Sequence, residues 1–132
     1  MPERLRFPYG DRGASRMPFL PLTLSRGALS VDVLGLVDSG AAVNVLPFEM
    51  GMQLGAVWEE QTTHVLLTGN LARAEARALL VTARVGSIGE VLMAFAWTKL
   101  DSVPLILGQM NFFLEFSICF FRYESFFDVT RR

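Results

Sequence analysis

Apolar and polar residues alternate in the first half of the chain with the two-residue rhythm of half-buried β-strands. The segments "PFLPLTLS" (residues 18–25) and "GALSVDVLGLV" (residues 27–37) both follow this rhythm. The Ser-Arg-Gly sequence at their junction is typical of a hairpin connection. The next segment, "AVNVLPFEMGMQLGA", predicts a strand and then a short turn or helix that begins at Pro47 and ends at Gly55.

The middle of the chain, "HVLLTGNLARAEARALLVTARV" at residues 64–85, predicts two more strands. Gly69-Asn70 is a favourable two-residue turn, so we expect a hairpin with its tip there. After the tip, charged residues alternate with alanines over residues 72–78, which is typical of an exposed ribbon. The same composition also favours a helix, and the alternation does not decide between the two.

The last third of the chain predicts short elements that are mostly buried. "EVLMAFAWT" (residues 90–98) and "SVPLILG" (residues 102–108) are apolar enough for buried strands, and "QMNFFLEF" after Gly108 favours a short helix. "ICFFRYESFFDV" predicts a terminal hairpin with its turn near residues 123–125. The chain is therefore expected to be mostly β, with many short strands and one or two helical turns.

The first residues differ from the rest. Residues 1–17 contain four arginines and several turn formers, and we expect an N-terminal arm that is mobile or loosely docked. A basic interaction tail is the alternative interpretation. Residues 18–132 are then expected to form one domain, because 132 residues suffice for one core and hardly for two.

Composition narrows the function classes. The formal net charge is −1 and 52% of the residues are hydrophobic, so we expect neither nucleic acid nor an anionic membrane as a partner, whereas self-association is favoured. Cys119 is the only cysteine, which excludes an intrachain disulfide and fits a reducing compartment. The start of the chain has no apolar run typical of a signal peptide, and the longest uncharged apolar stretch (residues 102–114) is shorter than the roughly 20 residues of a membrane helix. We expect a soluble, cytoplasmic protein.

The sequence "LVDSGAAVNVLP" contains the main candidate for chemistry. An apolar strand ends at Asp38, and the next two residues are Ser39 and Gly40. Gly40 permits a close approach of backbone or ligand, and the Ser39 hydroxyl can share hydrogen bonds beside the carboxylate. Asp-Ser-Gly is also ordinary turn chemistry, so these residues alone leave a surface turn and a catalytic carboxylate both open.

Other chemistries find less support. His64 is the only histidine, and Ser39 lacks the flanking glycines of a Gly-x-Ser-x-Gly motif, which argues against a Ser-His-Asp triad. One histidine and one cysteine make no zinc site, and we expect no metal and no cofactor. "VGSIGE" lacks the lysine of a phosphate-binding loop. Trp58 and Trp97 are interpreted as core or rim packing.

Two motifs in order resemble the retropepsin-like aspartic proteases. The sequence Leu-Val-Asp-Ser-Gly-Ala at residues 36–41 resembles the catalytic loop of that family, and Leu-Ile-Leu-Gly-Gln at residues 105–109 resembles the strand and helix start that support it. The expected hairpin lies between them, and the resemblance spans residues 18–129. The resemblance is in particular to the short bacterial branch of the family, with its cyanobacterial members among the candidates. Departures from the pattern are Ser39 in place of threonine, Ala42 in place of aspartate, and Met110 in place of aspartate or asparagine, which suggests reduced polar anchoring near the site.

The resemblance implies a fold and a site. It implies a single-lobe closed β-barrel with one short C-terminal helix, which acts as a homodimer because this chain offers one Asp-Ser-Gly only. It implies Asp38 as the catalytic residue, with a loop formed by Ser39, Gly40 and Ala41. It implies a flap that contacts substrate through Leu67, Thr68, Gly69, Asn70 and Leu71, and a supporting strand-helix junction at Ile106, Leu107 and Gly108.

The resemblance also implies an activity. The chain would be an aspartic endopeptidase that hydrolyses polypeptides bound in an extended conformation, with a water activated by Asp38 from two subunits. The alternative is a retropepsin-fold dimerisation or peptide-binding module with weak or no catalysis, and a third possibility is a monomeric precursor whose dimerisation is regulated. The C-terminal phenylalanines suit either the dimer interface or plain core packing: Phe120, Phe121, Phe126 and Phe127.

Overall fold

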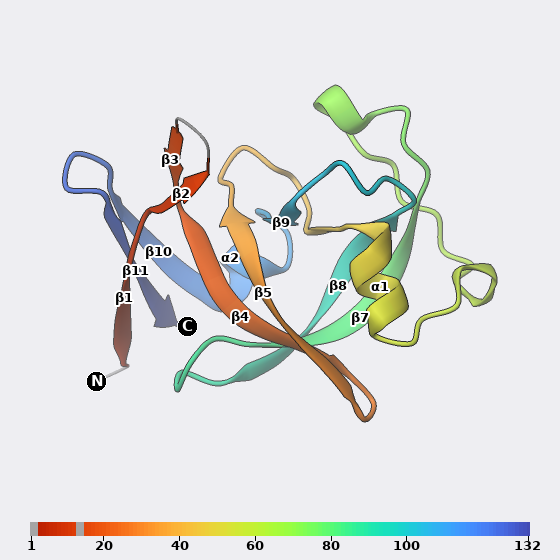
Figure 1. The fold of residues 1–132 in the computed structure, drawn as a ribbon, viewed down its shortest axis with the longest axis horizontal. Coiled ribbons are helices and arrows are strands. Elements are labelled where there is room, and N and C mark those ends of the chain that lie inside the picture. Colours follow the sequence, from red (N-terminus) through yellow and green to blue (C-terminus); the bar gives the residue numbers. More distant parts are fainter. Residues whose placement is uncertain (1–2, 13–14) are drawn as a thin grey trace.

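Six strands of the chain close into a barrel. The computed structural model describes residues 3–12 and 15–132, and the strand order around the barrel is β4-β5-β9-β6-β8-β7 (Figure 1). This confirms the expectation of a mostly β chain with a closed barrel. The barrel strands are β4 (Phe19–Arg26), β5 (Leu29–Val37), β6 (Val45–Leu46), β7 (Ala76–Arg84), β8 (Glu90–Thr98) and β9 (Leu105–Leu107).

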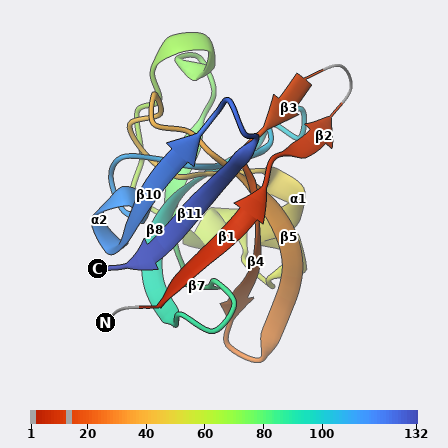
Figure 2. The ribbon, with the colours of Figure 1, turned by 90° about the vertical axis from the view of Figure 1, so that its left-hand side faces the viewer.

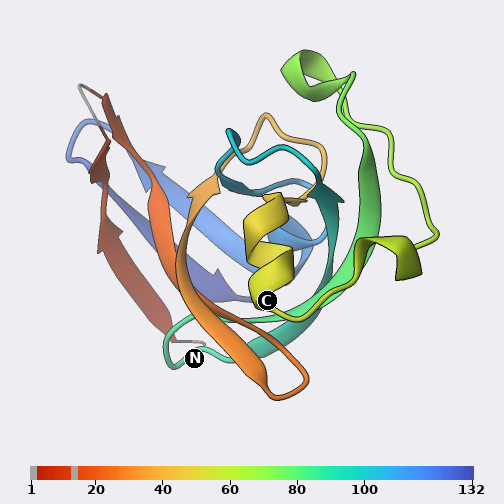
Figure 3. The same cartoon turned by 45° about the vertical axis from the view of Figure 1, so that its right-hand side comes forward.

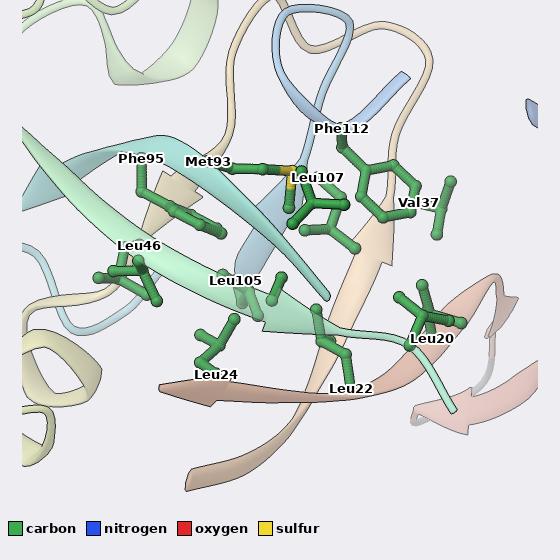
Figure 4. Packing of buried hydrophobic residues seen from close by; sticks show 14 of the residues in the cluster. Leu20, Leu22, Leu24, Val37, Leu46, Met93, Phe95, Leu105, Leu107 and Phe112 are labelled. Atoms are coloured by element: carbon green, nitrogen blue, oxygen red, sulfur yellow. The ribbon is translucent and has the colours of Figure 1, made fainter. Parts of the chain in front are cut away.

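Alternation of side chains places the core inside the barrel. In β4 the alternate residues Leu20, Leu22 and Leu24 are buried, as the two-residue rhythm predicts. Side chains from β8, β9 and the short helix α2 (Phe112–Glu115) point into the same interior (Figure 4). The barrel strands thus enclose one apolar core, which holds the strand ends that carry the candidate loop.

The prediction of a hairpin over residues 64–85 is only partly correct, because only its second strand, β7, forms. β7 pairs instead with β8 in a long antiparallel hairpin, and residues 61–75 carry no strand. The predicted two-residue turn at Gly69-Asn70 is wrong, because a 3-10 helix, Gly69–Leu71, occupies that place. The segment returns to β7 through an isolated antiparallel bridge between His64 and Arg77. It forms a wide loop that projects from the barrel at the upper right of Figure 1.

A second sheet joins the two ends of the described chain. Its order is β1 (Arg4–Pro8), β11 (Phe126–Arg131) and β10 (Phe116–Phe121), and the three strands lie side by side in Figure 2. The predicted terminal hairpin is confirmed. The arm expected over residues 1–17 differs from a loosely docked segment, because β1 pairs with β11 along its whole length and a small hairpin of β2 (Gly10–Arg12) and β3 (Ser15–Met17) follows. Residues 1–2 and 13–14 of that arm lie outside the described residues.

One buried carboxylate ties the first strand to the last. Asp128 is 3% exposed, and Arg6 donates to it from Nε at 2.8 Å and from Nη2 at 3.1 Å. This bond from Arg6 lowers the pKa of Asp128 below its usual range. The Arg6 guanidinium also lies over the ring of Phe126 at 3.8 Å. Register and charge therefore both fix β1 on β11.

The helix α1 (Phe48–Gln53) closes one end of the barrel, where it lies in front of the strands in Figure 3. It packs on Trp97, whose Nε1 donates to the carbonyl oxygen of Phe48 at 3.1 Å and whose ring stacks on that of Phe48. A Cβ atom on Gly51 would lie 2.2 Å from the Trp97 ring, so only glycine permits this approach. Trp58 completes the aromatic cluster, and both tryptophans are buried, as expected.

Candidate active site

Asp38 follows the last residue of β5, at the point where the chain leaves the barrel. Its backbone N–H donates to the carbonyl oxygen of Leu107 at 3.0 Å, which continues the parallel pairing of β5 with β9 by one residue. Its carbonyl oxygen accepts from the N–H of Ala41 at 3.1 Å, and its Oδ1 accepts from the N–H of Gly40 at 2.9 Å. The carboxylate is half-buried and held at the mouth of a tight loop.

Gly40 acts through its small size. The glycines with positive φ in the described chain do not include Gly40, so its backbone conformation does not require glycine. A Cβ atom at this position would lie 3.3 Å from Oδ1 of Asp38. The residue thus leaves the carboxylate face of the loop open.

The junction of β9 and α2 supports this loop with main-chain hydrogen bonds. The N–H of Gln109 donates to the carbonyl oxygen of Ala41 at 2.8 Å, and the N–H of Met110 donates to that of Ala42 at 2.8 Å. The Gln109 side chain adds a bond of 2.6 Å from Nε2 to the carbonyl oxygen of Ser39. The structure therefore brings together the two motifs that the sequence places about 70 residues apart.

Asn44 and Gly108 lock the same junction from inside. Asn44 is fully buried (0% exposed), and its Oδ1 accepts from the N–H of Gly108 at 2.9 Å while its Nδ2 donates to the carbonyl oxygen of Ala94 at 3.3 Å. A Cβ atom on Gly108 would lie 2.5 Å from the carbonyl oxygen of Val43. One buried amide thus joins β8, β9 and the candidate loop, and backbone contact at Gly108 leaves no room for a side chain.

A small apolar cluster lies between the barrel and the 65–75 segment. Leu67 is 7% exposed and packs with Val45, and the half-buried Ile106 and Leu71 lie against them. The other residues predicted for the flap, Thr68, Gly69 and Asn70, are exposed. Two of the five predicted flap residues thus face the barrel, and the rest form the exposed tip of the segment.

A hollow of about 250 Å³ lies beside Asp38. Its walls include Met17, Leu36 and Phe120, so it separates the candidate loop from the three-stranded sheet. Phe120 is 37% exposed there, whereas Phe127 is fully buried in the core. Phe121 and Phe126 are half-buried and pair with each other. Core packing therefore explains Phe127, and Phe120 is the phenylalanine that lines this hollow.

The remaining candidates for chemistry lie apart from one another. His64 is exposed, and Cys119 is an exposed free thiol. Across residues 3–12 and 15–132, no three side chains of the His, Cys, Asp and Glu types come together in a way that could hold a metal ion. In the same part of the chain, no helix is long and apolar enough to cross a membrane.

Sequence reasoning missed Asn44, and it placed Gln109 in the supporting motif without predicting the bond from its side chain to the loop. The resemblance suggested reduced polar anchoring because of Ala42 and Met110, but the two amide side chains supply anchoring from other positions. The signal for Asn44 was a polar residue inside the apolar run "VNVL", where a strand position would otherwise be buried. A buried amide in such a run requires partners, and the partners of Asn44 all lie in distant segments.

Comparison with solved structures gives the fold. The chain superposes on a retropepsin-like aspartic protease from Rickettsia conorii with a TM-score of 0.69 and 14% identity, over 99% of this chain and 94% of that chain. The chain has the retropepsin fold. It also superposes on the EIAV protease, solved in complex with the inhibitor HBY-793, with a TM-score of 0.53 and 18% identity over 75% of this chain and 88% of that one. No protein-family model and no curated protein matches the sequence.

The retropepsin fold confirms the resemblance that the two sequence motifs predicted. At these identities the superposition establishes the fold.

Proposed function

We propose that the protein is a homodimeric aspartic endopeptidase in which Asp38 of each subunit activates a water molecule. The observation that carries the proposal is the position of Asp38, at the end of a barrel strand of the retropepsin fold, where Leu107 and Gly40 fix its backbone and its Oδ1. The second oxygen, Oδ2, is left for a water molecule or for a second carboxyl group.

The chemistry requires two carboxyl groups. One accepts a proton from the attacking water while the other, protonated, donates a hydrogen bond to the carbonyl oxygen of the peptide bond. The sequence contains a single Asp-Ser-Gly, so the second group comes from another copy of the chain. A two-fold axis near Asp38 brings identical groups together, and the exposed ring of Phe120 in the adjacent hollow offers apolar surface for such an interface.

The substrate is a polypeptide in an extended conformation. Leu67 and Leu71 pack over the apolar surface around Val45 and Ile106, so an extended chain would bind between this surface and the 65–75 segment once the segment has moved away from the barrel. The segment does not form a regular hairpin, so it must reorganise to pair with the substrate backbone. Ser39 and Ala41 hold the shape of the loop beneath the substrate.

The test is hydrolysis of a peptide library at several pH values by the wild type and by Asp38→Asn. We expect the substitution to lower the rate of peptide hydrolysis about a thousandfold, because the amide cannot accept the proton of the water. Asp101→Asn is the matched control, since its Oδ1 accepts a bond from the N–H of Glu49 and an amide oxygen can replace it. Equal peptidase activity in the wild type and Asp38→Asn contradicts the proposal, as does a strict monomer at every concentration in light scattering.

A statine-type transition-state mimic distinguishes the enzyme from a peptide-binding module. Only a working pair of carboxyl groups stabilises the tetrahedral hydroxyl of such a compound, so we expect tight inhibition of the wild type and weak binding by Asp38→Asn. Equal affinity for both forms would favour the binding module. A cytoplasmic location is part of the proposal, because the exposed thiol of Cys119 suits a reducing compartment, and cell fractionation tests it.

A further inference from the structure

A large groove lies on the opposite side of β5 from the barrel core. Its volume is about 990 Å³, which is at the upper end of the range for ligand sites. Pro21, Asp32 and Leu34 form its floor on the outer face of β4 and β5, and Phe7 of β1 borders it. The groove shares no lining residue with the hollow beside Asp38. It is therefore a separate surface from the candidate active site.

The groove combines apolar floor with negative charge. Leu34 is 57% exposed at its floor, and the lining contains the carboxylates of Asp32, Glu49 and Asp101 but, within the described chain, no lysine or arginine. Arg84 approaches the adjoining surface and donates to Thr23 Oγ1 at 3.4 Å, and Thr23 in turn donates to Asp32. The charge of Asp32 is thus partly offset, and the net negative charge is concentrated at Glu49 and Asp101.

The backbone of β5 has a free edge beside this surface. The short strand β9 pairs with β5 only over residues 35–37. On that side, the described chain places no strand against residues 30–34 of β5, and α1 lies beyond the free edge instead (Figure 1). Unpaired N–H and carbonyl groups of an edge strand pair readily with an extended polypeptide.

From these features we propose that the groove docks an extended polypeptide segment in which arginine or lysine residues alternate with apolar residues. The apolar side chains contact Leu34 and Pro21, the cationic side chains face Glu49 and Asp101, and the backbone pairs with the edge of β5. The docking requires no catalysis, so it stands or falls independently of the role of Asp38.

The first test is fluorescence anisotropy with a labelled peptide of alternating leucine and arginine. The Asp38→Asn chain is used so that the probe is not cleaved, and a peptide with glutamate in place of arginine serves as the control probe. We expect saturable binding of the arginine peptide and none of the glutamate peptide. Failure of the arginine peptide to saturate, or equal binding of both peptides, overturns the proposal.

Matched substitutions locate the binding surface. Leu34→Thr and Glu49→Lys should each weaken binding about fivefold or more, because one removes apolar contact and the other reverses a charge. Leu80→Thr is the control for the first, since Leu80 is equally exposed (58%) on β7, and Glu59→Lys is the control for the second. Equal weakening by a substitution and its control overturns the assignment to the groove. Circular dichroism and melting temperature verify that each variant is folded.

Hydrogen exchange supplies a readout that does not depend on substitutions. We expect the bound peptide to slow exchange of alternate amides in residues 30–34, because edge pairing protects every second N–H. Protection confined to residues 38–42 and 67–71 would place the peptide at the candidate active site and overturn the proposal. A loss of dimer in light scattering for Leu34→Thr but not for Leu80→Thr would assign the groove to a second copy of the chain, and would overturn it also.

Discussion

Two segments of the candidate site, the loop at residues 38–44 and the segment at residues 65–75, are held in different ways. The loop at residues 38–44 is fixed by hydrogen bonds to distant parts of the chain, including those from Gln109 to Ala41 and from Gly108 to Asn44. The 65–75 segment makes its backbone hydrogen bonds within itself or with the start of β7. Four apolar side chains attach it to the rest of the barrel: Val65, Leu67, Leu71 and Ala74. Directional bonds fix a carboxylate in one geometry, whereas apolar contacts allow the opposite wall to shift around a ligand.

The largest effect is expected from a side chain placed at the junction of β9 and α2, which fixes the loop at residues 38–44. Gly108→Ala puts a Cβ atom 2.5 Å from the carbonyl oxygen of Val43, and backbone atoms must move to relieve the clash. We expect the free energy of unfolding to fall by about 2–4 kcal/mol. Chemical denaturation measures it. A change below about 0.5 kcal/mol would show that the junction is not rigid and would remove the contrast between the two segments.

Loss of the buried amide should have a somewhat smaller effect. Asn44→Ala leaves the N–H of Gly108 and the carbonyl oxygen of Ala94 without their partner, which costs about 2–3 kcal/mol of stability. Asn70→Ala is the matched control on the 65–75 segment, where the exposed amide should contribute less than about 0.5 kcal/mol. Equal losses in the two variants would contradict the comparison.

In the 65–75 segment, truncation of an apolar side chain should have a local effect on stability. Leu67→Ala removes a contact with Val45 and should weaken the packing of the 65–75 segment on the barrel by about 1–2 kcal/mol. Native-state hydrogen exchange should show roughly tenfold faster exchange in that segment with little change in the barrel strands. If exchange in the barrel strands becomes faster to the same degree, the segment unfolds together with the barrel and not independently of it.

The smallest effect is expected outside both segments, at the pair that fixes β1. Asp128→Asn weakens the charge-assisted bonds from Arg6, and because Arg6 is exposed we expect a loss of about 1 kcal/mol at neutral pH. The lowered pKa of Asp128 means that the wild type keeps this stability above the usual pKa of an aspartate and loses it as the pH falls through the lowered value. The difference in melting temperature between the wild type and Asp128→Asn should therefore shrink in strongly acidic buffer. A constant difference would show that charge does not hold the strand.

Local sequence patterns correctly predicted the strands that are recognisable by their apolar residues. The run "EVLMAFAWT" matches β8 residue for residue, because seven continuous apolar positions from Val91 to Trp97 suit a strand of a barrel. The two motifs around Asp38 and Gly108 were predicted to meet, and the hydrogen bonds from Gln109 to the loop show that they do. The assignment of a role in catalysis to these residues remains a prediction.

Other features depend on contacts that local patterns do not contain. The turn propensity of Gly69-Asn70 was overridden, because Leu67 and Leu71 both pack against the barrel and a 3-10 helix brings both leucines to one side. The pairing of β1 could not be predicted from its arginine-rich sequence, since the partner of Arg6 lies 122 residues further along the chain. The partners of Asn44 are also far away in the sequence: Gly108 lies 64 residues and Ala94 lies 50 residues further along the chain. Only the tertiary structure identifies them.

The pairing of β1 with β11 also affects the order in which the parts of the molecule can fold during synthesis. A ribosome adds about 5–20 residues per second, so Leu5 and Phe7 emerge roughly 6–24 s before the strand that covers them is made. During this interval Leu5 and Phe7 lack the partner strand that pairs with β1. The three-stranded sheet thus assembles after all six barrel strands have been made, and the barrel that carries Asp38 can form before it.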